Sequence, residues 1–164
     1  MVSPHQTEFE FRVRVMNSDH PHPIVIPPGA GKILSFLGVT HKLTRQQTGG
    51  AFYLFGFEFD PESGNTLHVH RYEDEVVCVL EGAIQIRLGN GSLQAGIGGV
   101  AHLPKAIPHA LYNPLTTPSR YLGIAIPGGM EHFFDELALA KEDGTLDDTL
   151  HKIISRRYGI EWLE

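Results

Sequence analysis

One short stretch of the chain carries the residue types of a metal site. His68 and His70 are two residues apart in a run with β character, so both imidazoles point to the same face of a strand. Four residues separate His70 from Glu75, which is enough to turn the chain and return a carboxylate beside the imidazoles. Neutral imidazole and carboxylate are ligands for a borderline divalent transition metal. Downstream, His109 begins another β-like run shortly after Pro104.

Each of these residues also has an interpretation without chemistry. Paired histidines on an exposed strand face usually bind nothing, and the acidic residues 73–75 could be a solvated hairpin tip. His109 alone could be an ordinary, partly buried histidine. Cys78, flanked by valines, is predicted to be a small core residue. Four further histidines lack ligand-like spacing and are expected to be structural or on the surface: His41, His102, His132 and His151.

Many short strands are predicted as the frame around these residues. The 164 residues include 18 glycines and 11 prolines, above average usage, which favours frequent turns. Strands are predicted over Phe9–Met16, Lys32–Leu43 and Ala51–Asp60, the last apolar on both faces and therefore inside the structure. Further strands are predicted over residues 66–70, 75–80, 83–88, 92–95, 99–103, 108–112 and 119–126. This regular spacing predicts a sandwich or a closed barrel.

The last quarter of the chain changes to a helical period. Apolar residues at helical spacing between Met130 and Ala138 predict an amphipathic helix, with Gly144 shortly past its end, in which the Phe133–Phe134 pair belongs to the core. A second helix is predicted from about Asp147 to Tyr158, with Gly159 as its stop signal. These helices are interpreted as a lid or brace on the barrel.

Charge and cysteine content exclude several classes of protein. The net charge of −6 argues against a nucleic-acid partner. The longest apolar run, Ala51–Phe57, is too short to span a bilayer, and residues 1–20 contain charges where a signal peptide needs an apolar stretch. The single cysteine allows no intramolecular disulfide, which suits a reducing compartment. We therefore expect a cytoplasmic protein without nucleic-acid or membrane partners.

The histidine stretch resembles the first motif of the cupin superfamily, specifically of its small single-domain members. That motif runs glycine, five residues, His-x-His, three or four residues, glutamate, six residues, glycine. His68-x-His70, four residues, Glu75, six residues and Gly82 follow it. Gly64 departs from it, because three rather than five residues separate it from His68.

The second cupin motif is similar to the segment around His109. It runs glycine, five residues, Pro-x-Gly, two residues, histidine, three residues, asparagine, and Gly98, Pro104, His109 and Asn113 lie at those spacings. Ala106 stands where the pattern has glycine. This departure and that at Gly64 concern turn geometry and not the ligands.

The resemblance implies an all-β fold, the cupin double-stranded β-helix or jelly-roll barrel, with short C-terminal helices. Its implied divisions are an N-terminal arm over 1–30, the barrel over 31–128 and a C-terminal helical segment over 129–164, in one structural domain. It also implies one divalent transition metal, of the group Fe, Mn, Ni, Co, Cu and Zn. The implied ligands are His68, His70, Glu75 and His109.

The overall layout looks like that of the quercetinase-like cupins. This likeness implies a dioxygenase acting on a small aromatic or enolic substrate, with Glu75 as the base that removes a hydroxyl proton. The aromatic strand with Phe52, Tyr53, Phe55 and Phe57 could line a flat apolar pocket, although core packing is the alternative. An isomerase, a decarboxylase, a polyketide-type cyclase and a non-catalytic binding protein remain alternatives on the same fold. A homodimer is expected, because Phe9–Met16 has no local hairpin partner.

Overall fold

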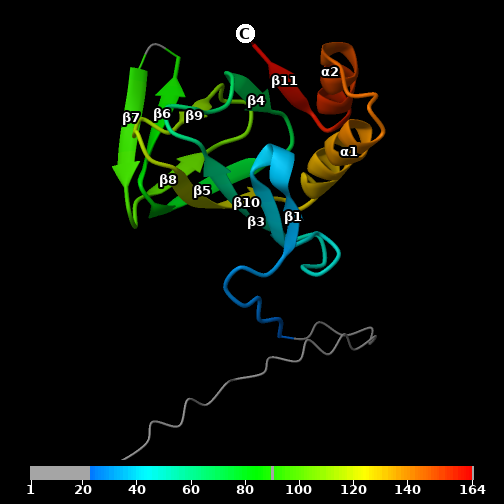
Figure 1. Ribbon diagram of the computed structural model, residues 1–164, viewed down its shortest axis with the longest axis horizontal. Helices are drawn as coiled ribbons and strands as arrows, with labels where there is room; N and C mark the ends of the chain where they lie inside the picture. The colour runs from blue at the N-terminus through cyan, green and yellow to red at the C-terminus, as the bar shows by residue number, and fades with distance from the viewer. Residues whose placement is uncertain (1–22, 90, 164) are drawn as a thin grey trace, which may run out of the picture.

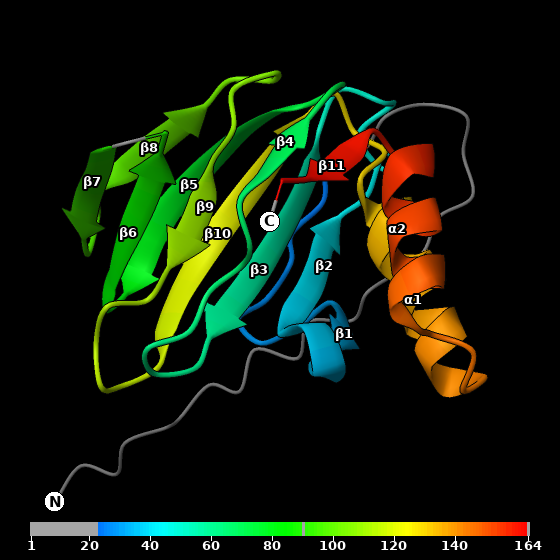
Figure 2. The same cartoon turned by 90° about the horizontal axis from the view of Figure 1, so that it is seen from above.

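The fold is a two-layer β structure with two helices and a final short strand at one end (Figures 1 and 2). The computed structural model describes residues 23–89 and 91–163. The predicted strand Phe9–Met16 lies outside the described residues. The elements, in chain order, are β1 (Lys32–Leu34), the 3-10 helix η1 (Ser35–Leu37), β2 (Val39–Leu43), β3 (Tyr53–Phe59), β4 (His68–His70), β5 (Asp74–Glu81), β6 (Ala83–Leu88), β7 (Gly91–Gly96), β8 (Val100–Leu103), β9 (Ala110–Tyr112), β10 (Ser119–Ile126), α1 (Glu131–Glu142), α2 (Asp148–Arg157) and β11 (Ile160–Trp162).

The larger layer is a six-stranded sheet in the order β1-β2-β3-β10-β5-β8. The opposite layer contains the sheet β7-β6-β9 and the pair β11-β4. Two isolated bridges, Gly64 to Tyr112 and His68 to His109, link the β4 side to the β9 side. All named strand pairs are antiparallel. Figure 2 shows β4 and β11 side by side across from β3.

The core lies between the layers and is rich in aromatic rings. On β3, Tyr53, Phe55 and Phe57 point to the buried face, as the two-residue period of a strand requires. Their rings stack in sequence, with centroids 4.7 Å and 5.6 Å apart. Strand β3 lies between β2 and β10, which confirms that it is an interior strand.

The predicted strand Lys32–Leu43 is interrupted, which corrects the sequence-based prediction. Residues 35–37 form a 3-10 turn, and Gly38 follows it with φ of 64°. A Cβ atom at Gly38 would lie 2.6 Å from the carbonyl oxygen of Glu58, so both the turn and the close approach require glycine. The chain then resumes as β2.

Two helices and β11 build a second apolar cluster beside the barrel. Its buried members are Phe133, Leu137, Ala140, Ile154 and Ile160. The first helix ends at Glu142, shortly before Gly144 as predicted. The second begins after Asp147, whose side chain accepts a hydrogen bond from the backbone N–H of Leu150 at 2.7 Å. Within the described residues, neither helix is long and apolar enough to cross a membrane.

The all-β prediction with C-terminal helices is confirmed. Cys78 corrects a smaller expectation. It is half-buried on the face of β5 opposite the buried residues Val77 and Val79, so it lies outside the core.

Candidate metal centre

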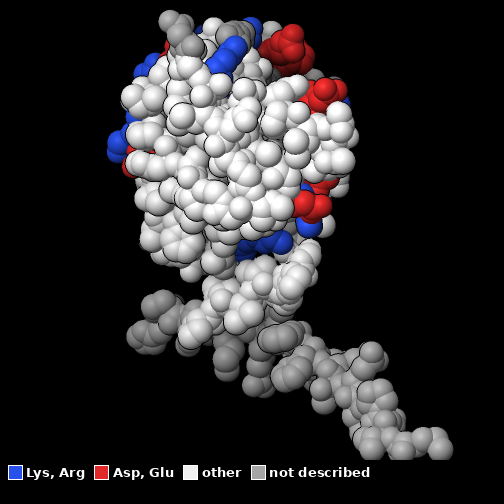
Figure 3. All heavy atoms as spheres, turned by 90° about the vertical axis from the view of Figure 1, so that its left-hand side faces the viewer, with Lys and Arg blue, Asp and Glu red and all other residues white. Residues whose placement is uncertain are grey.

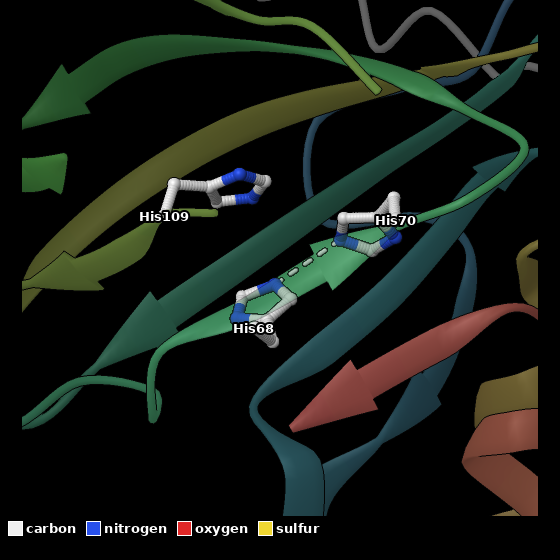
Figure 4. Close-up of side chains that lie close together, drawn as sticks. All are labelled: His68, His70 and His109. Carbon is white, nitrogen blue, oxygen red and sulfur yellow. Dashed lines mark hydrogen bonds between the residues drawn. The ribbon is translucent and has the colours of Figure 1, made fainter. Parts of the chain in front are cut away.

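Strand β4 presents two of the predicted ligands to the interior. His68 and His70 are each 4% exposed, while Val69 between them points to the opposite face. The backbone of His109 lies directly across from His68: each N–H donates to the other carbonyl, at 3.0 Å and 2.9 Å. The shared face predicted for His68 and His70 is therefore confirmed, and the fold brings His109 beside them (Figure 4).

Glu75 enters the same space from the opposite layer. It lies near the start of β5, and its side chain points inward because Glu75 shares the buried face of that strand with Val77. Its Oε2 atom is 3.8 Å from His70 Nε2 and 3.6 Å from His109 Nε2. All four residues predicted from the sequence thus converge, two from β4, one from β5 and one from the segment preceding β9.

The imidazole nitrogens gather around a common point. The Nε2 atoms of His68 and His70 are 3.1 Å apart, and one nitrogen from each of the three histidines lies within 4.8 Å of the others. A group of this size and composition can hold one metal ion, with the Glu75 carboxylate at its edge.

Hydrogen bonds to the backbone orient two of the three rings. His68 Nδ1 lies 2.7 Å from the carbonyl oxygen of Thr66, and His109 Nδ1 lies 3.0 Å from that of Ile107. A carbonyl can only accept, so each Nδ1 donates and each Nε2 carries a lone pair. The Nε2 atom of His109 is buried and has no hydrogen-bond partner. The lone pairs of His68 and His109 fit a divalent cation, and backbone-held imidazoles are typical of metal-ligating histidines.

Burial favours the neutral form of His68 and His70. Loss of hydration lowers the pKa of His68 to about 4, helped by the nearby His70 and His109. Burial likewise lowers the pKa of His70. Burial alone would raise the pKa of Glu75, but the three surrounding histidines, His109 above all, outweigh it and hold that pKa below its usual value. With neutral imidazoles and one carboxylate as ligands, a bound divalent ion would leave a net charge of +1.

A second buried carboxyl group lies beside the centre. Glu73 is 7% exposed, and one of its oxygens, Oε2, has no hydrogen-bond partner. Burial raises its pKa to about 7, and the charges of Glu131 and Glu75 add to the effect. Asp74 between them accepts a hydrogen bond from the Lys105 N–H at 2.9 Å. The acidic residues 73–75 are therefore not a solvated hairpin tip.

The two departures from the cupin motifs have local explanations. Ala106 adopts φ of 63°, the left-handed region that glycine occupies most easily, and its N–H donates to the His70 carbonyl at 2.8 Å. A Cβ atom at Gly64 would lie 2.2 Å from the Leu111 carbonyl oxygen, so glycine is needed there despite the shorter spacing. Both turns thus fix the strands that carry the histidines.

Asn113, the last residue of the second motif, has a structural role. It is fully buried, and its amide nitrogen donates to the carbonyls of Phe59, Asp60 and Thr117. Its oxygen accepts from the Leu115 N–H and the Ser119 hydroxyl. Asn113 thereby ties the end of β3 to the start of β10.

The candidate centre opens onto a cleft of about 930 Å³. His68, His70 and Glu75 are among its lining residues. Aromatic rings from several parts of the chain line it as well, among them Phe55 and Phe57 of β3, Phe133 and Phe134 of α1, and Trp162 of β11. Of the aromatic strand predicted to face a pocket, Phe52 and Tyr53 do not line the cleft.

Sequence reasoning missed the contribution of the C-terminal segment. Trp162 and His151 line the cleft, with ring centroids 5.4 Å apart. The three residues of β11 are too few to give a strand period, and His151 lies on a helix far from the motifs in sequence. The available signal was that Trp162 is the only tryptophan of the chain. Of the histidines expected to be structural or on the surface, His41 is buried, His102 and His132 are exposed and His151 is half-buried.

The chain is similar to a known domain family. The family model described as cupin domain matches residues 56–134, which contain all four converging residues. No curated protein matches the chain significantly.

Solved structures share the architecture. A predicted oxalate decarboxylase from Thermotoga maritima is 21% identical with a TM-score of 0.50, over 54% of this chain and 78% of that one. An uncharacterized protein with a double-stranded β-helix domain from Klebsiella pneumoniae is 19% identical with a TM-score of 0.49, over 55% and 76%. The polyketide cyclase RemF from Streptomyces resistomycificus is 24% identical with a TM-score of 0.47, over 54% and 65%. The family match and the Thermotoga structure confirm the predicted double-stranded β-helix.

Proposed function

From the premise that residues 56–134 form a cupin domain, we propose that this protein is a metal-dependent enzyme for a small aromatic or enolic substrate. The metal ligands would be His68, His70, Glu75 and His109. One observation carries the proposal: three imidazole nitrogens and a carboxylate converge at the buried floor of an aromatic-walled cleft.

The proposed reaction is a dioxygenation of the quercetinase type. Four protein ligands leave two positions of an octahedral ion free, and a bound ion would supply Lewis acidity and, if redox-active, reactivity toward dioxygen. The cleft walls support a flat apolar substrate, because Phe55, Phe57 and Phe134 offer ring faces and edges to it. The net charge of +1 at the loaded centre favours a substrate that binds as its anion.

Glu75 is the proposed base. It lines the cleft, is ionised at neutral pH and lies between His70 and His109, with its Oε2 atom 3.8 Å and 3.6 Å from their Nε2 atoms. Its Oε2 atom is thus placed to accept the hydroxyl proton of a substrate that enters from the cleft. The same four residues would serve an isomerase, a decarboxylase or a cyclase that needs no dioxygen.

The test is oxygen uptake under defined metal loading. Protein loaded separately with Fe, Mn, Ni, Co, Cu or Zn is mixed with a flavonol in air, and dioxygen and flavonol are followed together. His109→Ala serves as the matched control. Equal consumption of both, absent in the control, is expected. Loss of flavonol without oxygen uptake would contradict a dioxygenase and favour one of the alternative enzymes. Flavonol binding without turnover would indicate a non-catalytic binding protein.

A homodimer is part of the proposal. Leu93 on β7, Ile97 in the turn after β7, and Val100 on β8 are 61%, 72% and 65% exposed, respectively. Figure 3 shows that charged side chains lie mainly at the rim of the face formed by these strands. An uncharged apolar face of this kind suits a second copy of the chain. Light scattering is expected to give twice the mass of the 18.2 kDa chain, and a monomer at micromolar concentration would contradict it.

A further inference from the structure

We propose that Trp162 is a positioning residue that holds the His68 imidazole in its metal-binding orientation. The inference rests on the proposed metal centre and adds a segment that the cupin-domain match does not include, because that match ends at residue 134. The C-terminal strand β11 would thus stabilise the position of β4, the strand that carries His68 and His70.

Strand β4 has little support of its own. It is three residues long, and on one side it is held by the His68–His109 bridge and by the Ala106 N–H, which donates to the His70 carbonyl at 2.8 Å. On the other side it pairs with β11, in the register Ile160 to His70 and Trp162 to His68. Two further backbone bonds extend this pairing: Leu163 N–H to the Leu67 carbonyl at 2.9 Å and Arg71 N–H to the Gly159 carbonyl at 2.8 Å. Without β11, the strand that carries two ligands would be a sheet edge.

The register places Trp162 on the same face as His68. Directly opposed residues of antiparallel strands project their side chains to the same side. The centroids of the Trp162 indole and the His68 imidazole are 4.9 Å apart, at 41°. The opposite neighbour of His68 is His109, at 4.6 Å and 63°. The His68 ring is therefore held between two rings.

The indole itself is anchored. Its Nε1–H donates to the Ser155 hydroxyl at 2.8 Å, and that hydroxyl donates to the His151 carbonyl at 2.7 Å. Ser155 is fully buried, so this hydrogen bond forms away from water. The ring of Trp162 thus has a fixed position relative to α2.

The Nδ1 bond to Thr66 fixes only one direction of the His68 ring. Rotation about the axis of that bond is limited by packing, and on the cleft side the packing comes from Trp162, which lines the cleft with His68. Removing the indole would let the imidazole rotate into the cleft and turn its Nε2 lone pair away from His109 and Glu75. Outer partners of metal ligands typically contribute 10–100-fold in affinity.

Zn²⁺ affinity, measured by competition with a chromophoric chelator, tests the role of the ring. Trp162→Ala is expected to weaken binding about 10-fold or more. Trp162→Phe retains an aromatic face and is expected to stay within about threefold of the wild type. Glu161→Gln is the matched control: it alters the neighbouring residue, whose side chain pairs with Arg71 at the surface, and leaves the His68 contact in place. Its affinity is expected to be unchanged.

Tryptophan fluorescence gives a second readout that does not depend on turnover. Because Trp162 is the only tryptophan, emission from the folded protein reports on the surroundings of His68. Addition of Cu²⁺ is expected to quench this emission, and a chelator is expected to restore it. In His109→Ala the same Cu²⁺ concentration should leave the emission unquenched.

A folded Trp162→Ala protein, with unchanged circular dichroism, that binds Zn²⁺ as tightly as the wild type would overturn the inference. An equal loss in Glu161→Gln would also overturn it, since strand pairing rather than the ring would then be responsible. If Trp162→Ala does not fold, Ser155→Ala, which releases the indole N–H, replaces it and is expected to weaken binding about threefold. Wild-type affinity there would overturn the inference. A wild-type protein that binds no metal would instead refute the proposed function.

Discussion

Among the residues that the structure describes, histidines are buried in two places, and one of these has the arrangement of a metal centre. In the candidate centre, two Nδ1 atoms bond to backbone carbonyls and the Nε2 atoms converge on one another and on Glu75. At the other place His41 is alone: its Nδ1 lies 2.6 Å from the Tyr53 hydroxyl and its Nε2 faces Asp135 at 3.2 Å. Lys32 pairs with the same carboxylate at 2.6 Å.

The histidines of the two places are equally buried. The places differ in whether ligand atoms converge and in whether the nearby carboxylate is paired with a cation. His41 and His68 are both 4% exposed, and burial lowers the pKa of both. Around His41, the negative charge of Asp135 is already matched by the Lys32 ammonium. Around Glu75, the nearest side chains are the imidazoles of His70 and His109, and in the described part of the chain no Lys or Arg pairs with its carboxylate. A bound cation would therefore stabilise the candidate centre around Glu75 and not the surroundings of His41.

The sharpest way to test this contrast is to remove one histidine from each place. His109→Ala removes one of the converging lone pairs and is expected to weaken binding of a divalent metal by at least about 100-fold, more than an outer-shell change. His68→Ala and His70→Ala should do the same. His41→Ala is expected to leave the affinity unchanged. Isothermal titration with Co²⁺ or Zn²⁺ measures it, and equal losses in His109→Ala and His41→Ala would remove the distinction.

Glu75 sharpens the comparison, because a ligand that is also a base should affect turnover more than binding. Glu75→Gln keeps the shape and a weak oxygen ligand but removes the charge and the basicity. We expect the variant to fold with metal occupancy only partly reduced. Its activity per bound metal is expected to fall by about 100-fold or more. Metal content and turnover are measured on the same preparation. Unchanged activity per bound metal would leave Glu75 as a ligand only.

A substitution at Tyr53 tests whether the hydrogen bond between Tyr53 and His41 stabilises the fold. Tyr53→Phe removes only the hydroxyl and leaves the buried His41 Nδ1 without its partner. The free energy of unfolding is expected to decrease by about 1–3 kcal/mol, the usual effect of an unsatisfied buried polar atom. Urea denaturation measures this decrease. Metal affinity, tested in parallel, is expected to stay at the wild-type value, and a marked loss would mean that the two places are coupled.

The smallest expected effect is the pH dependence contributed by His41. Burial lowers its folded-state pKa below 6.5, although Asp135 acts in the opposite direction. Below pH 6.5 the unfolded chain therefore binds a proton that the folded chain does not, and stability falls as the pH falls. The slope due to one such group is at most about 1.4 kcal/mol per pH unit.

His41→Gln cannot be protonated and provides the reference for this effect. In metal-free protein, the stability of the wild type should decline more steeply than that of His41→Gln as the pH decreases from 7 toward the folded-state pKa of His41. The remaining slope of the variant belongs to other groups with shifted pKa, among them His68, His70 and Glu73. Identical slopes for the two proteins would show that His41 is not held neutral by burial.

Local sequence signals predicted most of the strands and the position of the candidate ligands. The two-residue spacing of His68 and His70 fixed their common face, and the length of the turn before Glu75 allowed its return. Turn residues defined β6 and β10 with the bounds that the structure has. These features depend on the period of a strand and on turn chemistry, which neighbouring residues determine.

The features that escaped prediction depend on contacts between distant parts of the chain. Strand β11 exists because β4 offers it an unpaired edge, and three residues carry no period that would reveal it. Gly38 interrupts the strand expected over Lys32–Leu43 because the Glu58 backbone approaches it closely. The orientation of His109 relative to Glu75 depends on the packing of both sheets. Tertiary structure alone brings such pairs together.

The central claim is that His68, His70, Glu75 and His109 bind one divalent metal ion, and anomalous X-ray scattering tests it most directly. A crystal of the protein loaded with Zn²⁺ would be measured on both sides of the zinc absorption edge. The account predicts one strong anomalous peak about 2.0–2.1 Å from the Nε2 atoms and about 2.0–2.2 Å from a Glu75 oxygen. No peak among these four residues, or a peak at His41 and Asp135 in its place, would contradict the account.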